Sequence, residues 1–203
     1  REDFRREDAP WGCKTSVTAD LSYSDKTTSD PACITAWDID SEDVWHVTDL
    51  WKERAMPDIT ANMLATFCLD HKPKELLLET VDDNFGGSLI RDIFRRRGVR
   101  TPIVTVSAAG DKVQKATSYR GQVSRGKVSV PETPWAEAFI DEHLRFPNGK
   151  NDDMVDNGSL LGRRMDTLRA PSVKASQMRY GRNSGQHIIN SLNREKSTKR
   201  RFA

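Results

Sequence analysis

Three aspartates crowd one short segment of the sequence. The stretch NGKNDDMVDNG (148–158) contains Asp152, Asp153 and Asp156, after a turn-forming Asn-Gly pair and at the start of a helical pattern. The N-terminus of a helix stabilises negative charge through its dipole and free N–H groups, which accounts for one or two of these aspartates. A bound cation would account for all three.

Two further acids end apolar segments elsewhere in the chain. Asp20 closes the β-rich stretch TSVTAD, and Glu79 follows three leucines in ELLLET. A carboxylate beside a buried strand is costly unless it is paired, hydrogen-bonded or bound to metal. If these acids meet the aspartate cluster at one edge of a sheet, they can bind Mg²⁺, which prefers oxygen ligands. Two such ions about 4 Å apart can activate a water and stabilise the leaving oxygen of a phosphodiester.

Each acid also has a simpler interpretation. Asp20 alone fits a turn residue, Glu79 alone fits a strand end that meets solvent, and the cluster at 152–156 fits a helix cap. The metal-site hypothesis is favoured because the five acids stand on elements that one sheet could bring together.

The elements that must position these acids alternate between strand and helix patterns. Strands are expected at 15–22, 32–39 and 43–51 as an antiparallel meander, then a helix at 57–71, a buried parallel strand at 74–81, a helix at 86–98 and a strand at 101–107. A basic helix with a brief extended piece is expected within 110–131, a helix at 134–147 and a last helix at 152–168. The predicted fold class is α/β, with a central mixed sheet, an antiparallel meander plus parallel strands, flanked by helices.

The last helix is expected to turn one apolar stripe toward the core. At helical spacing this stripe comprises Met154, Gly158, Leu161, Met165 and Leu168. The three aspartates then lie on the other side of the first turn.

Charge divides the chain into two expected parts. Residues 169–203 contain nine Lys or Arg residues and one Glu, which leaves 23 basic and 29 acidic residues in 1–168. We therefore expect one domain over 1–168 and a basic tail over 169–203 that is mobile or folds on a polyanionic or acidic partner.

Several classes of protein are disfavoured by the sequence. Cys13, Cys33 and Cys68 are odd in number and far apart, which disfavours a disulfide framework or a zinc knuckle and fits a reducing compartment. No apolar run is long enough to cross a bilayer, and no phosphate-binding GxxxxGK[ST] motif occurs. The start REDFRRED is expected to be a cut inside a longer chain.

The order of these motifs resembles that of a known family. The series TADLSYS, LLLETVDDNFGGSLI, DKVQKATSYRGQVSRGKVSVP and EHLRFPNGKNDDMVDNGSLL is similar to the C-terminal nuclease domain of the large terminase subunit of tailed bacteriophages, over about residues 12–165. The resemblance implies an RNase H-like fold and a metal-dependent endonuclease that cleaves double-stranded viral DNA during genome packaging. An ATPase motor domain, absent from this chain, would accompany it in the complete protein.

The resemblance also implies roles for individual residues. Asp20, Glu79 and Asp153 match the family's catalytic acids, and Asp152 and Asp156 match neighbouring acids, so all five are expected metal ligands for two Mg²⁺ or Mn²⁺ ions. The expected mechanism is two-metal-ion hydrolysis without a dedicated side-chain base. One departure is Asn151, because the family often has His before the paired aspartates. The expected contacts to the DNA backbone are Lys112, Lys115, Arg120, Arg125 and Lys127.

The implied partners are double-stranded DNA and, in the full protein, an ATPase domain, the portal protein and the small terminase subunit. The implied location is the host cytoplasm, in a packaging complex and not in the mature virion, with no membrane association. Two alternatives stay open. One is another RNase H-like nuclease of the junction resolvase type, and the other is a non-catalytic module that docks on portal or DNA and whose acids hold a structural ion.

Overall fold

A computed structural model of the chain describes residues 4–21, 31–79, 86–107 and 110–169. Contacts divide the chain into one unit over Arg1–Leu168 and a second over Arg169–Ala203. Apart from Arg169, the expected basic tail lies outside the described residues. Within these ranges, none of the helices combines the length and apolar character needed to cross a membrane.

A seven-stranded mixed sheet forms the centre of the first unit, in the order β1-β7-β4-β3-β2-β5-β6. Its antiparallel meander consists of β2 (Lys14–Asp20), β3 (Ala32–Ile39) and β4 (Trp45–Glu53), as the sequence predicted. Strands β5 (Glu75–Glu79) and β6 (Ile103–Val106) extend the sheet in parallel beside β2, which confirms the predicted parallel strands.

Two short strands complete the other edge of the sheet. Strand β1 (Phe4–Arg5) pairs in parallel with β7 (Val128–Ser129), which in turn pairs in parallel with β4. The brief extended piece after the basic helix was predicted, whereas β1 was not. A two-residue strand shows no alternation, so its pairing depends on contacts distant in the sequence, such as those of the buried Phe4 ring with Phe139 and His143.

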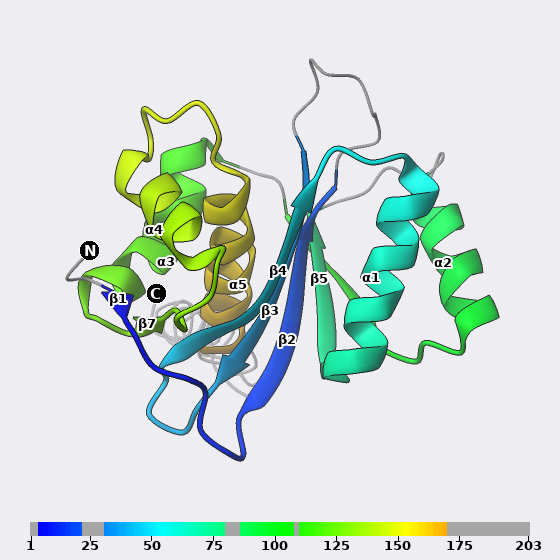
Figure 1. Cartoon of the computed structure of the whole chain (residues 1–203), viewed down its shortest axis with the longest axis horizontal. Helices are drawn as coiled ribbons and strands as arrows, with labels where there is room; N and C mark the ends of the chain where they lie inside the picture. The colour runs from blue at the N-terminus through cyan, green and yellow to red at the C-terminus, as the bar shows by residue number, and fades with distance from the viewer. Residues whose placement is uncertain (1–3, 22–30, 80–85, 108–109, 170–203) are drawn as a thin grey trace, which may run out of the picture. The chain divides into compact units, whose positions relative to one another are not determined.

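Helices cover both faces of the sheet (Figure 1). Helices α1 (Pro57–His71) and α2 (Gly86–Arg97) pack on one face. Helices α3 (Lys112–Ser124), α4 (Ala136–Arg145) and α5 (Asp153–Arg169) pack on the other. All five occur where the sequence predicted helices, with bounds that differ by a few residues.

Local residue choices explain where the helices begin and end. Pro57 occupies the first turn of α1, where its missing N–H costs nothing, and Lys72 ends that helix in the left-handed conformation. The Asp111 side chain caps α3 by accepting a hydrogen bond from the Gln114 N–H, at 2.8 Å.

Alternation along the strands separates two cores. On the α1–α2 face, Val17, Ile34 and Leu76 pack with apolar side chains of both helices. On the α3–α5 face, Trp37 and Leu77 pack with aromatic and aliphatic side chains of the three helices. Successive residues of each strand therefore pack into different cores.

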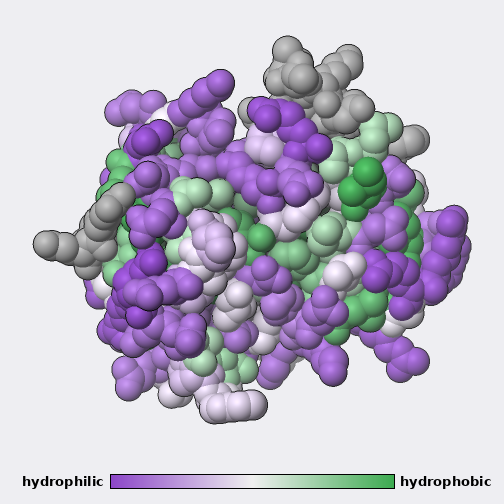
Figure 2. Space-filling view, in the orientation of Figure 1, coloured by the Kyte–Doolittle hydropathy of each residue, from purple (hydrophilic) through white to green (hydrophobic). Residues whose placement is uncertain are grey.

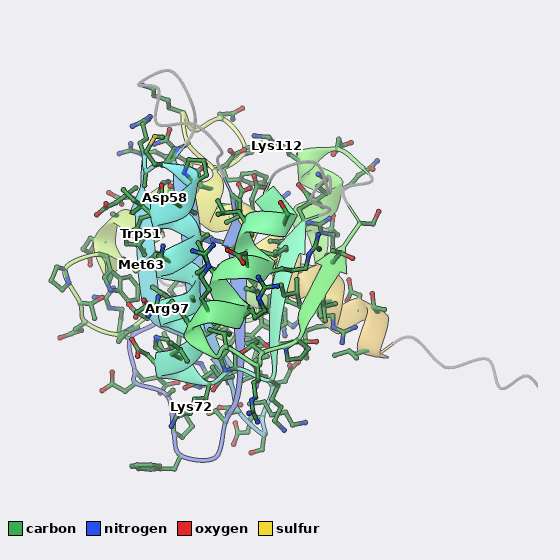
Figure 3. All side chains as sticks on the ribbon, turned by 90° about the vertical axis from the view of Figure 1, so that its right-hand side faces the viewer. Trp51, Asp58, Met63, Lys72, Arg97 and Lys112 are labelled. Carbon is green, nitrogen blue, oxygen red and sulfur yellow. The ribbon has the colours of Figure 1, made fainter. Side chains whose placement is uncertain are left out.

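Helices α1 and α2 are joined at one end by an arginine. Arg97 Nη1 donates hydrogen bonds to the Asn62 carbonyl oxygen at 2.6 Å and to Thr66 Oγ1 at 2.9 Å, and its position beside α1 is visible in Figure 3. Hydrophobic surface lies among charged residues in the right-hand part of Figure 2, where α1 and α2 lie. Ile59 of α1 is half-exposed.

The first half of α5 is buried more completely than its predicted stripe implied. Residues 153–162 are all buried except Asp156, because this stretch lies between the sheet and the helices α3 and α4. Leu168 does not follow the prediction, since 57% of its surface is exposed at the far end of the helix. The aspartate-bearing turn is thus held inside the protein.

Candidate active site

One row of residues crosses four strands on the α3–α5 face. In the antiparallel pairs, Asp20 stands opposite Cys33, and Cys33 stands opposite Lys52. On the other side, Ala19 pairs with Leu78 in parallel register, so Asp20 and Glu79 follow side by side at the ends of their strands. Opposed residues share a face of the sheet, so this row places a glutamate, an aspartate and a lysine along one edge.

The first turn of α5 brings the three aspartates to this row. Asp20 is partly buried, and this burial together with the negative charges of Asp156, Asp153, Glu79 and Asp152 raises its pKa to about 7. All five acids that the sequence singled out therefore interact electrostatically at one place.

Asp156 feels the same surroundings. Burial raises its pKa to about 6, with Asp152 and Glu79 adding to the rise, while the positive charges of Lys112 and Lys115 oppose it. The two lysines come from the first turns of α3, which therefore lies beside the acids.

Cationic side chains hold two of the carboxylates. Glu79 Oε1 lies 2.8 Å from Lys115 Nζ and 3.1 Å from Arg163 Nη2. Arg163 also donates a hydrogen bond to the carbonyl oxygen of Ser107, just after β6. At the rim of the site, Lys112 Nζ lies 2.5 Å from Asp152 Oδ2.

Asp153 belongs to a buried ionic group with residues of β4 and α4. Lys52 Nζ lies 2.8 Å from Asp153 Oδ2 and 2.5 Å from Glu142 Oε2. The other Glu142 oxygen, Oε1, accepts a hydrogen bond from the Met154 N–H at 2.6 Å. The first turn of α5 is thus held to α4 through the Met154 N–H and to β4 through the Asp153 side chain.

A second buried anchor fixes α5 one turn further on. Asn157 Nδ2 donates to the carbonyl oxygen of Cys33 at 3.0 Å and to Thr35 Oγ1 at 3.2 Å. Because Cys33 is opposite Asp20, this amide sets the distance between the helix acids and the strand acid.

The donor set at this place suits a hard divalent cation. Among the described residues, no three side chains of the types Asp, Glu, His and Cys already stand together as a metal-binding group. Lysines and Arg163 instead pair with Glu79, Asp152 and Asp153. Yet four carboxylates surround the partly buried Asp20, and oxygen ligands are what Mg²⁺ and Mn²⁺ prefer. The residues therefore fit such an ion if these cations release the carboxylates they now hold.

The five basic residues predicted to contact DNA do not lie together. Lys112 and Lys115 stand among the acids, and Lys112 is seen at the start of α3 in Figure 3. Arg120 lies further along α3, and Arg125 directly follows its last residue. Lys127 Nζ donates to the Glu42 carbonyl oxygen, near the turn between β3 and β4. Only the first two are therefore next to the acids.

Sequence reasoning missed four residues of the site: Lys52, Glu142, Asn157 and Arg163. The available signals were weak, namely a lysine in the apolar strand pattern of β4 and polar residues on helices that also carry apolar stripes. None of these positions is unusual until the packing of the elements is known.

The fold and the family can be placed by comparison with known proteins. A family model described as the terminase RNaseH-like domain matches residues 17–160. No curated protein matches the chain in sequence.

Solved structures of similar fold come from phages and yeast. The magnesium-bound large terminase nuclease of thermophilic phage G20c has a TM-score of 0.56 and 15% identity, over 78% of this chain and 92% of that one. The large terminase nuclease domain of Thermus phage P74-26 gives 0.56 and 15%, over 78% and 90%. The yeast mitochondrial Holliday junction resolvase Ydc2 gives 0.50 and 11%, over 87% and 86%.

The G20c nuclease has also been solved with bound zinc and with bound cobalt. At these identities the likeness concerns the fold, which is RNase H-like, as the family resemblance implied. The family model covers most of the sheet and all five acids, from the middle of β2 into α5. The chain therefore belongs to the family of terminase RNaseH-like domains.

Proposed function

We propose that this chain is a metal-dependent endonuclease that cleaves double-stranded viral DNA during genome packaging. The observation that carries the proposal is the position of Asp20, partly buried at the end of β2 with Glu79 and the three α5 aspartates as its charged neighbours. So much negative charge in one place costs free energy unless cations neutralise it, and a phosphodiester is cleaved where such cations are held.

Each acid has a role in the proposed reaction. Asp20 stands beside the strand acid Glu79 and interacts with the helix acid Asp153, so it would serve two Mg²⁺ or Mn²⁺ ions, with Asp152 and Asp156 as additional ligands. When bound, these ions would supply activation of a water and stabilisation of the leaving oxygen. The metals in the G20c nuclease structures support the choice of a divalent cation.

The basic residues around the acids compete with metal before the reaction. Lys115 and Arg163 hold Glu79, and Lys112 holds Asp152, so these ammonium and guanidinium groups would have to move before the carboxylates could bind a divalent cation. Lys112 and Lys115 stand beside the acids, where they can exchange these carboxylates for the phosphates of bound DNA. This competition predicts modest affinity for the free ion and tighter binding in the presence of DNA.

The family supports the biological setting. In a complete terminase the domain would act with an ATPase domain, the portal protein and the small terminase subunit, in the host cytoplasm. We propose these partners and this location because the chain belongs to a terminase family.

Plasmid cleavage tests the proposal. Wild-type protein should degrade linear and circular duplex DNA with Mg²⁺ or Mn²⁺ and should stop on addition of a chelator. Asp20→Asn, Glu79→Gln and Asp153→Asn should each lose at least about 100-fold in rate, because each removes a ligand oxygen's charge. Asp49→Asn is the matched control, since Asp49 is a strand aspartate that pairs with His71 on the opposite face of the sheet.

Two outcomes would overturn the proposal. One is metal-dependent cutting that survives all three substitutions, and the other is wild-type protein that binds Mn²⁺ but cuts no DNA. A four-way junction and an RNA–DNA hybrid belong in the same assay, because the yeast junction resolvase has a similar fold. Strong preference for the junction over linear duplex would favour a resolvase.

A further inference from the structure

A lysine lies among the acids where its charge is almost fully enclosed. The side chain of Lys52 is 14% exposed, and its two partners Glu142 and Asp153 are 8% and 6% exposed. Burying one cation with two carboxylates leaves one uncompensated negative charge, so this group would be expensive as simple packing. We therefore relate the position of Lys52 to the neighbouring acid site.

The fold puts Lys52 in line with the strand acid. Lys52 stands opposite Cys33, which stands opposite Asp20, so the lysine and the aspartate share one face of the sheet two strands apart. The Lys52 ammonium reaches Asp153 from the sheet side while α5 covers it from above. Lys52 is thus a fixed positive charge that contacts one of the five acids, Asp153, and the neighbouring Glu142.

The two oxygens of the Asp153 carboxylate are not equivalent. Its Oδ2 atom lies 2.8 Å from Lys52 Nζ, as an ion pair. This contact leaves Oδ1 as the oxygen available to another cation. Glu142 completes the arrangement, because one of its oxygens holds Lys52 and the other accepts the Met154 N–H.

We propose that Lys52 and Glu142 are positioning residues for Asp153, and that the charge of Lys52 sets how tightly the acid site binds a divalent cation. The inference rests on the proposed nuclease function. Lys52 holds one Asp153 oxygen and would weaken the binding of a divalent cation by its positive charge, which Glu142 partly cancels. The site then keeps its geometry at the expense of affinity.

The charge of the ionic group predicts opposite changes in Mn²⁺ affinity for two substitutions. Lys52→Met removes a positive charge, so Mn²⁺ should bind about tenfold more tightly, since the acids keep their negative charges. The cleavage rate should nevertheless fall about 10- to 100-fold, because Asp153 is no longer held in place. Glu142→Gln keeps an oxygen for the Met154 N–H but leaves Lys52 less neutralised, so Mn²⁺ should bind more weakly.

Two further variants separate charge from packing. Lys52→Arg keeps the charge, so its Mn²⁺ affinity should stay near the wild-type value even if its bulk lowers the rate. The double variant of Lys52→Met with Glu142→Gln restores the net charge of the ionic group, so its affinity should also return toward wild type. A purely structural role would instead weaken metal binding in every variant as α5 loses its anchor.

Mn²⁺ binding is measured by titration calorimetry on each full-length variant, and amide hydrogen exchange at Met154 reports whether the first turn of α5 is still held. Opposite shifts in affinity for Lys52→Met and Glu142→Gln support the inference, whereas weaker binding in both overturns it. If Lys52→Met does not fold, Glu142→Gln and Lys52→Arg decide, and equal losses of affinity in these two count against it. Wild-type protein that binds no Mn²⁺ and cuts no DNA would refute the proposed function instead.

Discussion

At the scale of single residues, Asp20 is stabilised as a neutral acid in the metal-free protein. Burial and the surrounding carboxylates raise its pKa to about 7, whereas an aspartate in an unfolded chain titrates near 3.8. The folded state therefore binds the proton more tightly than the unfolded state, and the free energy of unfolding falls as pH rises from about 4 to 7. Above pH 7 the ionised Asp20 destabilises the fold.

The raised pKa of Asp20 predicts that replacing this essential acid stabilises the folded protein. In the presence of a chelator at pH 8, Asp20→Asn should raise the free energy of unfolding by about 2–4 kcal/mol, since about three pKa units are removed. The gain should shrink at pH 5, where Asp20 is already protonated in the fold. Urea denaturation at both pH values measures it, and a variant less stable than wild type at pH 8 would contradict it.

His143 should behave in the opposite direction. Burial lowers its pKa to about 4. Its Nδ1 atom lies 2.7 Å from the Phe139 carbonyl oxygen, so Nδ1 carries the proton, and Nε2, 2.8 Å from Tyr119 Oη, accepts from the tyrosine. Its contribution to stability is complete above about pH 6.5 and is lost as pH falls toward 4.

NMR of the imidazole nitrogens tests this assignment. At pH 5.5 His143 should remain neutral with its proton on Nδ1, while the protein stays folded. Tyr119→Phe should cost about 1–2 kcal/mol, because it leaves Nε2 buried without a donor. A His143 titration midpoint above pH 6 in the folded protein would refute the assignment.

At the scale of elements, the close approach of α3 and α5 depends on glycine. A Cβ atom built on Gly158 would lie 2.3 Å from Tyr119 Cε1, and one on Gly162 would lie 2.9 Å from the Tyr119 backbone nitrogen. These two glycines let the helices pack close enough for Lys112 and Lys115 to reach the acids.

A matched pair of alanine substitutions tests this packing. Gly158→Ala should lower the free energy of unfolding by about 3 kcal/mol or more, because the buried Tyr119 ring must move. Gly121→Ala, on a helix and with its nearest neighbouring atom at 3.5 Å, should instead be neutral or raise it by up to about 1 kcal/mol. Thermal unfolding of both variants measures the difference, and equal effects would contradict the proposed role of Gly158.

The elements themselves could be predicted from the sequence because each carries its own pattern. Alternation predicted β2, β3 and β4, three leucines predicted the buried β5, and Asn-Gly followed by aspartates predicted the start of α5. The acids that end those elements could be predicted with them. The prediction that these acids meet at one place depended on the resemblance to a known family, because no single segment of the sequence determines the order of the strands.

Lys52 could not be placed by the same reasoning, for a physical reason. A bulge in β4 pairs Ala36 with Asp49 but Trp37 with Val47, so one extra residue interrupts the alternation. Before the bulge odd-numbered residues such as Val47 face the α3–α5 core, and after it even-numbered ones such as Leu50 do. A strict period of two would therefore turn Lys52 to the wrong face.

At the scale of the whole molecule, metal binding should be linked to folding. Because a site with five carboxylates binds cations only when folded, millimolar Mn²⁺ should raise the melting temperature of the wild-type protein at pH 8 by several degrees. Asp153→Asn should reduce this shift, and Asp49→Asn should leave it unchanged. Differential scanning calorimetry measures it, and equal shifts in all three proteins would show that the metal binds elsewhere.

DNA binding is the second property of the whole molecule, and charge limits where it can occur. Residues 1–168 contain more acidic than basic side chains, so attraction for DNA within this unit must come from local groups rather than from net charge. Lys112 is 64% exposed beside the acid site, whereas Lys14 is an exposed lysine at the far end of β2 from Asp20.

Salt dependence distinguishes these two lysines. Measured in a chelator with the full-length chain, Lys112→Gln should weaken duplex binding several-fold and reduce the slope of log affinity against log salt by about one. Lys14→Gln removes the same charge and should change neither quantity. Equal effects of the two substitutions would mean that DNA responds to total charge, and would remove Lys112 from the DNA path toward the acids.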